Sequence, residues 1–225
     1  MSRTYRELLD QAVIDFSLYT GDIQNRGTAA MTMITIGTPR FSRIPGRQSV
    51  GLEQVALTDG IRSSAVIAPI VDVTGTITIE YAGYFKSPGV DQLFFQSAAT
   101  GGFNMNCPVA NRIDLVFYSA AGGYTVAREI RGPAILTPAN NYHLVVTSTT
   151  GGTAGQWYAF GAPAATTLIG AGVTASSGNA LLYAGGNYQG LWYSEVVRAW
   201  QGALDASEVA LLYNAYSTLT VPSKL

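Results

Sequence analysis

The feature that most constrains this chain is an alternation of short strand-like segments and turns over nearly its whole length. Segments rich in Val, Ile, Tyr and Phe recur between clusters of Gly, Ser, Thr and Asn, and helical spacing occurs near the two ends. Many short strands separated by such turns are typical of antiparallel sandwiches. We therefore expect an all-β fold, an antiparallel two-sheet jelly-roll sandwich with a short N-terminal helix and a short C-terminal helix. The expected strands are 12–18, 31–36, 48–57, 65–71, 75–85, 93–97, 113–119, 124–130, 142–147, 157–160 and 181–184.

The stretch 190–216 combines a strand, a tight turn and a helix. Apolar side chains occupy both alternating sets of positions in its first half, which predicts a strand buried on both faces. Asp205 is followed three residues later by Glu208, the spacing of a capping box at a helix start. Val209, Leu212, Tyr213 and Tyr216 then follow at helical spacing, so the helix has one apolar face to pack against the strands.

This ending resembles that of laminin G-like domains in the concanavalin A-like class. Their last strand leads into the connection Ala-Leu-(Ser/Thr)-x-x-Glu-(Ile/Val)-x-x-Leu-Tyr, and Glu195 followed by Val196 keeps half of an Asp-Glu pair found on that strand. The resemblance implies a laminin G-like sandwich at 13–225, preceded by a helical arm at 1–12. The matching residues are Ala203, Leu204, Asp205, Glu208, Val209, Leu212 and Tyr213.

Charge is scarce in this sequence. Charged residues make up 12%, against roughly 25% in typical soluble domains. Such a surface is favourable where part of it is covered by neighbours, so we expect a homo-oligomer or a larger assembly. The 13 basic and 14 acidic residues are scattered, which argues against nucleic acid as a partner. The lone Cys107 excludes an internal disulfide.

The sequence shows no segment that predicts targeting to a membrane or to the secretory route. The N-terminus has no apolar signal-peptide segment, and no run approaches the roughly twenty apolar residues of a membrane span. We therefore expect no membrane partner and synthesis in a host cytoplasm.

The sequence patterns that would indicate a catalytic site are weak. Glycoside hydrolysis requires paired carboxylates, and neither Glu80 nor Glu195 has a second carboxylate two residues away. His143 is the single histidine, and in a strand it more often has a structural role. We expect a non-enzyme with no catalytic residues and no cofactor. Calcium stays open as an alternative, because four aspartates lie near turns, although each also suits a turn residue bonded to its own backbone. These are Asp22, Asp59, Asp72 and Asp91.

Two sets of side chains are candidates for binding. Tyr188, Trp192 and Trp157 could stack on sugar rings, with core or subunit contact as the alternative, since aromatic residues are favoured in all three settings. The N-terminal helix, expected at 2–12 with Ser2 as its cap, carries Arg3, Tyr5, Arg6 and Leu9. A helix this short must dock on the domain or on a neighbouring subunit, so these four are interface candidates.

The resulting hypothesis is a non-catalytic structural protein of a virus particle, either a bacteriophage capsid decoration (cement) protein or a tail-associated protein. It rests on the low charge, the small-residue loops, the absence of a leader and an analogy with phage particle proteins of this fold. Its partners would be copies of itself and capsid or tail subunits, and its location the virion. The alternative is a carbohydrate-binding module that recognises a surface glycan. Fold alone does not decide between them.

Overall fold

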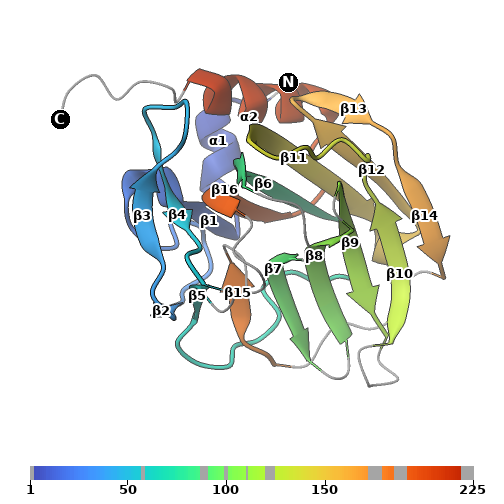
Figure 1. Ribbon diagram of the computed structural model, residues 1–225. Coiled ribbons are helices and arrows are strands. Elements are labelled where there is room, and N and C mark those ends of the chain that lie inside the picture. Colours follow the sequence, from blue (N-terminus) through green and yellow to red (C-terminus); the bar gives the residue numbers. More distant parts are fainter. Residues whose placement is uncertain are drawn as a thin grey trace.

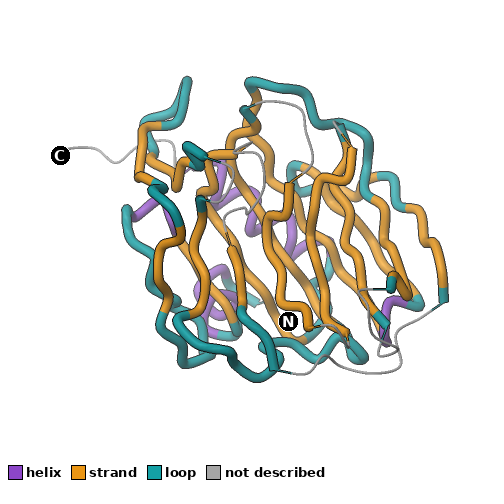
Figure 2. Tube along the Cα trace, turned by 60° about the horizontal axis from the view of Figure 1, so that its bottom comes forward, coloured by secondary structure: helices purple, strands orange, loops and turns teal. Residues whose placement is uncertain are grey.

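The computed structural model describes residues 3–56, 59–86, 91–98, 101–109, 111–119, 125–171, 179–184 and 192–218. It consists of two eight-stranded antiparallel sheets packed face to face (Figures 1 and 2), as the sequence predicted. Sheet A runs β13 (Ala162–Ala164), β12 (Ala154–Ala159), β11 (Asn140–Thr149), β6 (Ile77–Phe85), β16 (Trp192–Gln201), β4 (Val50–Glu53) and β3 (Arg40–Arg43), and β1 (Ile14–Ser17) also pairs with β16. Sheet B runs β14 (Thr167–Gly170), β10 (Val126–Arg131), β9 (Arg112–Tyr118), β8 (Gly101–Val109), β7 (Asp91–Ala98), β15 (Leu182–Ala184), β5 (Gly60–Ser63) and β2 (Met33–Ile36).

The main core lies between the two sheets. Alternate residues of the central strands point into it, as Ile79 and Tyr81 of β6 and Val197 of β16 show. The opposite face of sheet A is buried as well, because Trp200 of β16 and Ala82 of β6 belong to apolar clusters on that side. The prediction that the closing strand is buried on both faces is therefore confirmed.

Two helices cover the outer face of sheet A. Helices α1 (Tyr5–Asp10) and α2 (Ala206–Thr218) lie together on one side of the sandwich, away from β7, β8 and β10 (Figure 1). Leu8 and Leu212 pack with Trp200 in one buried cluster, and the Trp200 indole donates a 2.7 Å hydrogen bond to the carbonyl of Leu8. Two short 3-10 turns, Leu18–Thr20 and Thr150–Gly152, complete the helical content described. No described helix is long and apolar enough to cross a membrane.

The helix caps confirm one prediction and correct another. Asp205 Oδ1 accepts from the Glu208 backbone N–H, and Glu208 returns the contact to the Asp205 N–H at 3.0 Å, so the predicted capping box opens α2. Helix α1 is capped by Thr4 instead of Ser2, since Thr4 has Glu7 at the third helical position and forms a capping box with it.

The strand at 65–71 was wrongly predicted. The segment forms one isolated bridge, at Ile67, and the buried Gln96 side chain takes the place of a partner strand. Gln96 accepts from the Ile70 N–H at 2.8 Å and donates to the Ala68 carbonyl at 2.9 Å. Conversely, β8 was not anticipated, because its Gly, Asn and Pro residues have low strand propensity.

Candidate functional site

A groove of about 690 Å³ opens where β11 begins, between the segment before β11 and the β12–β13 hairpin. Its lining combines apolar side chains, two aromatic residues, two asparagine amides and a threonine hydroxyl, and none of the lining residues carries a charge. Pockets of this composition are typical of small-molecule sites. The lining residues are Pro133, Ile135, Thr137, Asn140, Asn141, Tyr142, Ala159, Phe160, Ala164 and Ala165.

Tyr142 fixes one wall of the groove, which is formed by the chain segment immediately before β11. Its hydroxyl accepts a hydrogen bond from the Thr137 N–H at 2.7 Å and donates to the carbonyl of Ile135 at 3.0 Å. Ala139, in the same wall, has a φ of 63°, and its N–H bonds the Phe85 carbonyl at 2.9 Å. A left-handed alanine costs free energy that surrounding contacts must offset. The wall is thus held in one conformation by the tyrosine and by β6.

Phe160 forms the opposite wall from the tip of the β12–β13 hairpin. Ala159 pairs with Ala162, so the loop has two residues, Phe160 and Gly161, and both have positive φ values, 53° and 78°. These values match a type I′ turn, in which Asn-Gly is favoured. Glycine is required at 161, where a Cβ would lie 2.9 Å from Tyr213. Phenylalanine at 160, in contrast, is an unfavourable residue for its backbone conformation.

The Phe160 ring is partly open to solvent. The residue is 43% exposed, and the ring lies 5.7 Å from that of Tyr142 and 6.2 Å from that of Tyr213, between centroids. These two neighbours support the ring from the protein side. An exposed, supported ring beside a groove has the form of a stacking surface for an apolar ligand face.

The polar groups of the groove are amides and hydroxyls. The Asn140 amide donates to Thr137 Oγ1 at 2.9 Å. Asn141 Oδ1 is buried and makes no hydrogen bond to any residue that the structure describes. A buried acceptor without a partner is costly and favours a donor from a ligand. Because no lining residue is charged, the groove favours an uncharged ligand that donates hydrogen bonds.

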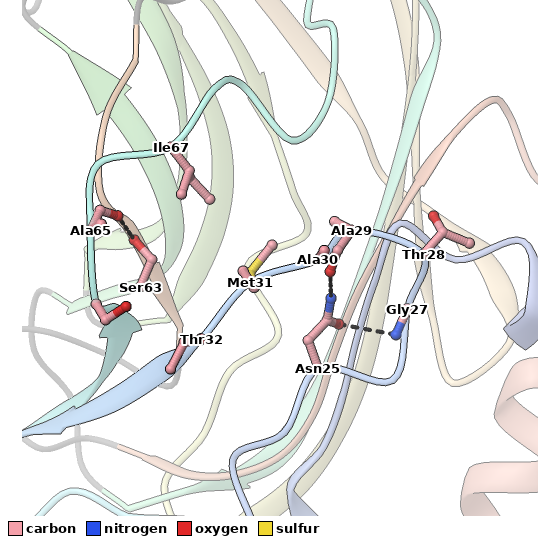
Figure 3. A pocket seen from close by; sticks show the side chains of 11 residues that line it. Asn25, Gly27, Thr28, Ala29, Ala30, Met31, Thr32, Ser63, Ala65 and Ile67 are labelled. Atoms are coloured by element: carbon pink, nitrogen blue, oxygen red, sulfur yellow. Dashed lines mark hydrogen bonds between the residues drawn. The ribbon is translucent and has the colours of Figure 1, made fainter.

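A second groove, also about 690 Å³, lies between residues 25–32 and 63–67 (Figure 3). Its lining consists of small residues together with Asn25, Met31 and Ile67, and its central polar groups already bond to the protein. Asn25 accepts from the Gly27 N–H and donates to the Ala29 carbonyl, and Ser63 donates to the Ala65 carbonyl. Unlike the first groove, it offers no aromatic ring among its lining residues, so it is the weaker candidate.

The predicted stacking residues lie elsewhere. Trp157 and Trp192 are 0% exposed and belong to the core between the sheets, so the structure corrects both from glycan contacts to packing residues. Tyr188 falls outside the described residues. Phe160 was not predicted as a site residue because it falls at the end of the expected strand 157–160. The adjacent Phe-Gly pair between two strand segments was the available turn signal.

The predicted interface residues are divided between the domain and the solvent. Arg3 makes a two-point contact with Glu208 of α2, with 2.7 Å between Nη2 and Oε2. Tyr5 is half-buried in the packing of α1. Arg6 is exposed and Leu9 is half-exposed. The first helix therefore docks on its own domain, and a contact with another subunit through Arg6 and Leu9 stays a prediction.

His143 lies in a buried polar network beneath the helices. Its Nε2 is 2.8 Å from Glu80 Oε1, and Glu80 also accepts from Arg198, which bonds Asp15 on its other side. Burial alone would raise the pKa of Glu80, but Arg198 and His143 outweigh it and hold that pKa below its usual value. Ser17 completes the network. His143 and Glu80 are both fully buried, which supports a structural role for the histidine.

Glu195, on β16, is also buried. It lies at a bulge of β16, accepts from Ser49 at 2.7 Å and from the Tyr216 hydroxyl at 2.6 Å, and lies 3.5 Å from Arg47. Burial raises its pKa, although Arg47 acts in the opposite direction. These contacts tie β16 to α2, so this carboxylate connects secondary structure elements.

The carboxylates near turns bond to neighbouring backbone. Asp22 accepts from the Gln24 N–H, Asp72 from the Thr74 N–H, and Asp59 from the Val55 and Ala56 N–H groups. Asp91 has no described side chain. Within the described ranges, no group of three or more His, Cys, Asp or Glu residues could hold a metal ion.

Comparisons with known proteins place the fold. No family model matches the sequence, and no curated protein matches it. Solved structures do. The binding domain of botulinum neurotoxin serotype D has a TM-score of 0.70 at 7% identity, covering 95% of this chain and 53% of that chain. A structure of botulinum neurotoxin type C, whose cell entry depends on interaction with two ganglioside molecules, has a TM-score of 0.66 at 9% identity, with coverages of 94% and 53%.

A third match comes from outside the botulinum group. The binding domain of Paraclostridial Mosquitocidal Protein 1 has a TM-score of 0.66 at 13% identity, covering 93% of this chain and 53% of that chain. This chain thus spans about half the length of the structures that it matches. Such low identities establish the fold alone, and the chain shares the lectin-like β-sandwich fold found in these toxin binding domains.

Proposed function

We propose that this chain is a non-catalytic glycan-binding domain, and that its binding site is the groove beside Phe160, between the segment before β11 and the β12–β13 hairpin. The observation that best supports this proposal is the Phe160 ring, which is 43% exposed. Phe160 lies in a type I′ turn, at a positive-φ position that is unfavourable for phenylalanine. A pyranose has an apolar face that packs on such a ring, and hydroxyls that could donate to Asn141 Oδ1. The uncharged lining favours neutral hexoses over sialylated sugars.

The shared fold supports this proposal. One serotype D ligand-binding domain was solved in complex with N-acetylneuraminic acid, at a TM-score of 0.66 and 8% identity. The botulinum DC binding domain was solved with rat synaptotagmin II, so this sandwich also supports protein recognition. For this chain, the amide-lined and uncharged groove favours a sugar over a peptide, because it offers no charged partner for side chains of a protein ligand.

The test is a glycan array that contains neutral and sialylated oligosaccharides, followed by calorimetric titration with the strongest neutral ligand. Phe160→Asn and Asn141→Ala should each weaken binding by about tenfold or more, the value of one lost stacking or hydrogen-bonding contact. The control is Val66→Asn, which changes a residue that is 58% exposed and outside the groove. An array with no neutral ligand, or full affinity in both groove variants, would reject the site.

A structural role in a virus particle is the second candidate, and the sparse charge of 12% favours it. Both roles are compatible, because a particle protein can present a glycan-binding groove outward. The first test is whether the coding sequence lies in a viral genome, and the second is cosedimentation of the purified protein with particles of that virus. Specific retention on capsids or tails would support the role, and no retention on either would remove it.

A further inference from the structure

One long part of the chain has no charged residue. Residues 132–194 contain no Asp, Glu, Lys or Arg. In the structure this run supplies the outermost strand of each sheet on the same side of the sandwich, β13 in sheet A and β14 in sheet B. Both lie at one margin of the molecule in Figure 1. This side therefore lacks the charges that usually keep sheet edges apart.

The two edge strands, β13 and β14, differ in how well their open edges are protected against pairing with a further strand. Pro163 lies in the middle of β13 and removes a backbone donor from that edge. Strand β14 has no such device, and all four of its residues are exposed. Leu168 and Ile169 are 37% and 39% exposed. Among the described residues, β14 pairs with β10 alone, so its other edge is open to a further strand.

The register of β14 shows what a partner would cover. Leu168 lies opposite Ile130, which is fully buried in the core, while Ile169 lies opposite Glu129 on the outer face. Leu168 is thus at the open end of the main core. A strand added here would cover Leu168 and extend both the sheet and the apolar layer beneath it.

We propose that the open edge of β14 binds β14 of a second copy of this chain, in an antiparallel pair about a two-fold axis at Leu168. This register places Leu168 opposite its own copy and Thr167 opposite Ile169. It keeps every side chain on its original face, and the closed symmetry leaves no free β14 edge. A second copy suits this edge because two charge-free strands meet without repulsion, and the strand itself offers no charge to select a different partner.

The interface is short, so we expect a concentration-dependent dimer instead of an obligate one. The experiment is sedimentation equilibrium of the full chain over a concentration series. Ile169→Lys places a charge in the paired strand and should raise the dimer dissociation constant by about tenfold or more. The matched control is Ile34→Lys on β2, the opposite edge of the same sheet, where Ile34 is 36% exposed.

A second variant reports the register directly. Leu168→Cys should form an intermolecular disulfide under mild oxidation, since the native Cys107 is buried, whereas Ile34→Cys should not. Circular dichroism and glycan titration of Ile169→Lys monitor folding and the groove, neither of which involves this side chain. A wild-type protein that stays monomeric throughout the series would overturn the proposal. Dissociation by Ile34→Lys, or cross-linking through position 34, would also overturn it in favour of pairing through β2.

Discussion

Replacing Phe160 by Asn should leave stability almost unchanged, although it deletes a large aromatic side chain. Two opposing contributions lead to this result. Phe160 occupies a left-handed conformation with φ 53°, which costs about 1–2 kcal/mol for a residue other than glycine, and Asn tolerates it better. The ring is 43% exposed, so it realises about half of the ~1.5–3 kcal/mol that a fully buried Phe supplies.

Phe160→Ala separates these contributions, because it removes the ring without relieving the backbone. We expect the Ala variant to lose about 1–2 kcal/mol and the Asn variant to change by less than about 1 kcal/mol. The assay is urea unfolding followed by tryptophan fluorescence, which suits a chain whose three tryptophans are at most 2% exposed. An Ala variant as stable as the Asn variant would refute the backbone argument. A loss of about 3 kcal/mol in the Asn variant would show that the ring is a structural residue.

Two further predictions concern buried charge. Arg198→Met should lower the free energy of unfolding by about 3–5 kcal/mol, since Asp15 and Glu80 would lose their shared cation. The control is Arg6→Met, which changes an exposed residue. A loss of stability no larger than in the control would contradict the reasoning. Burial raises the pKa of Asp114 from 3.8 to about 6, with Arg112 opposing it. The stability that this group contributes is therefore present below about pH 4 and is lost as pH rises through about 6. Asp114→Asn should flatten that decline in unfolding experiments at a series of pH values, and parallel pH profiles for the two proteins would exclude the assignment.

Local rules explain why the end of the chain was predicted well. The Asp205–Glu208 capping box involves residues three positions apart, and the alternation along β16 is a property of one strand. The sandwich class follows from the same kind of local evidence, repeated along the chain. These features depend on neighbours in sequence, which sequence analysis reads directly.

The remaining features depend on contacts between distant segments. Arg198 and Asp15 are 183 positions apart, so the network under the helices has no sequence signature. Gln96 satisfies the backbone at 67–70 from another strand, which explains why an apolar segment there is not a strand. Trp157 and Trp192 illustrate a different limit, since a ring that suits a sugar also suits a core.

The groove and the β14 edge are neighbours in sequence as well as in space. Ala164 and Ala165 line the groove, and Thr167 begins β14 two residues later. Pairing through β14 would therefore bring two grooves close to one interface, where a weak site gains effective concentration on a surface that displays many copies of one glycan. We therefore expect affinity for a soluble monovalent sugar to depend on Phe160 and not on pairing, and retention on such a surface to depend on both. The charge-free run would thus give one side of the sandwich both a neutral groove and, through the proposed β14 pairing, a second copy of that groove nearby.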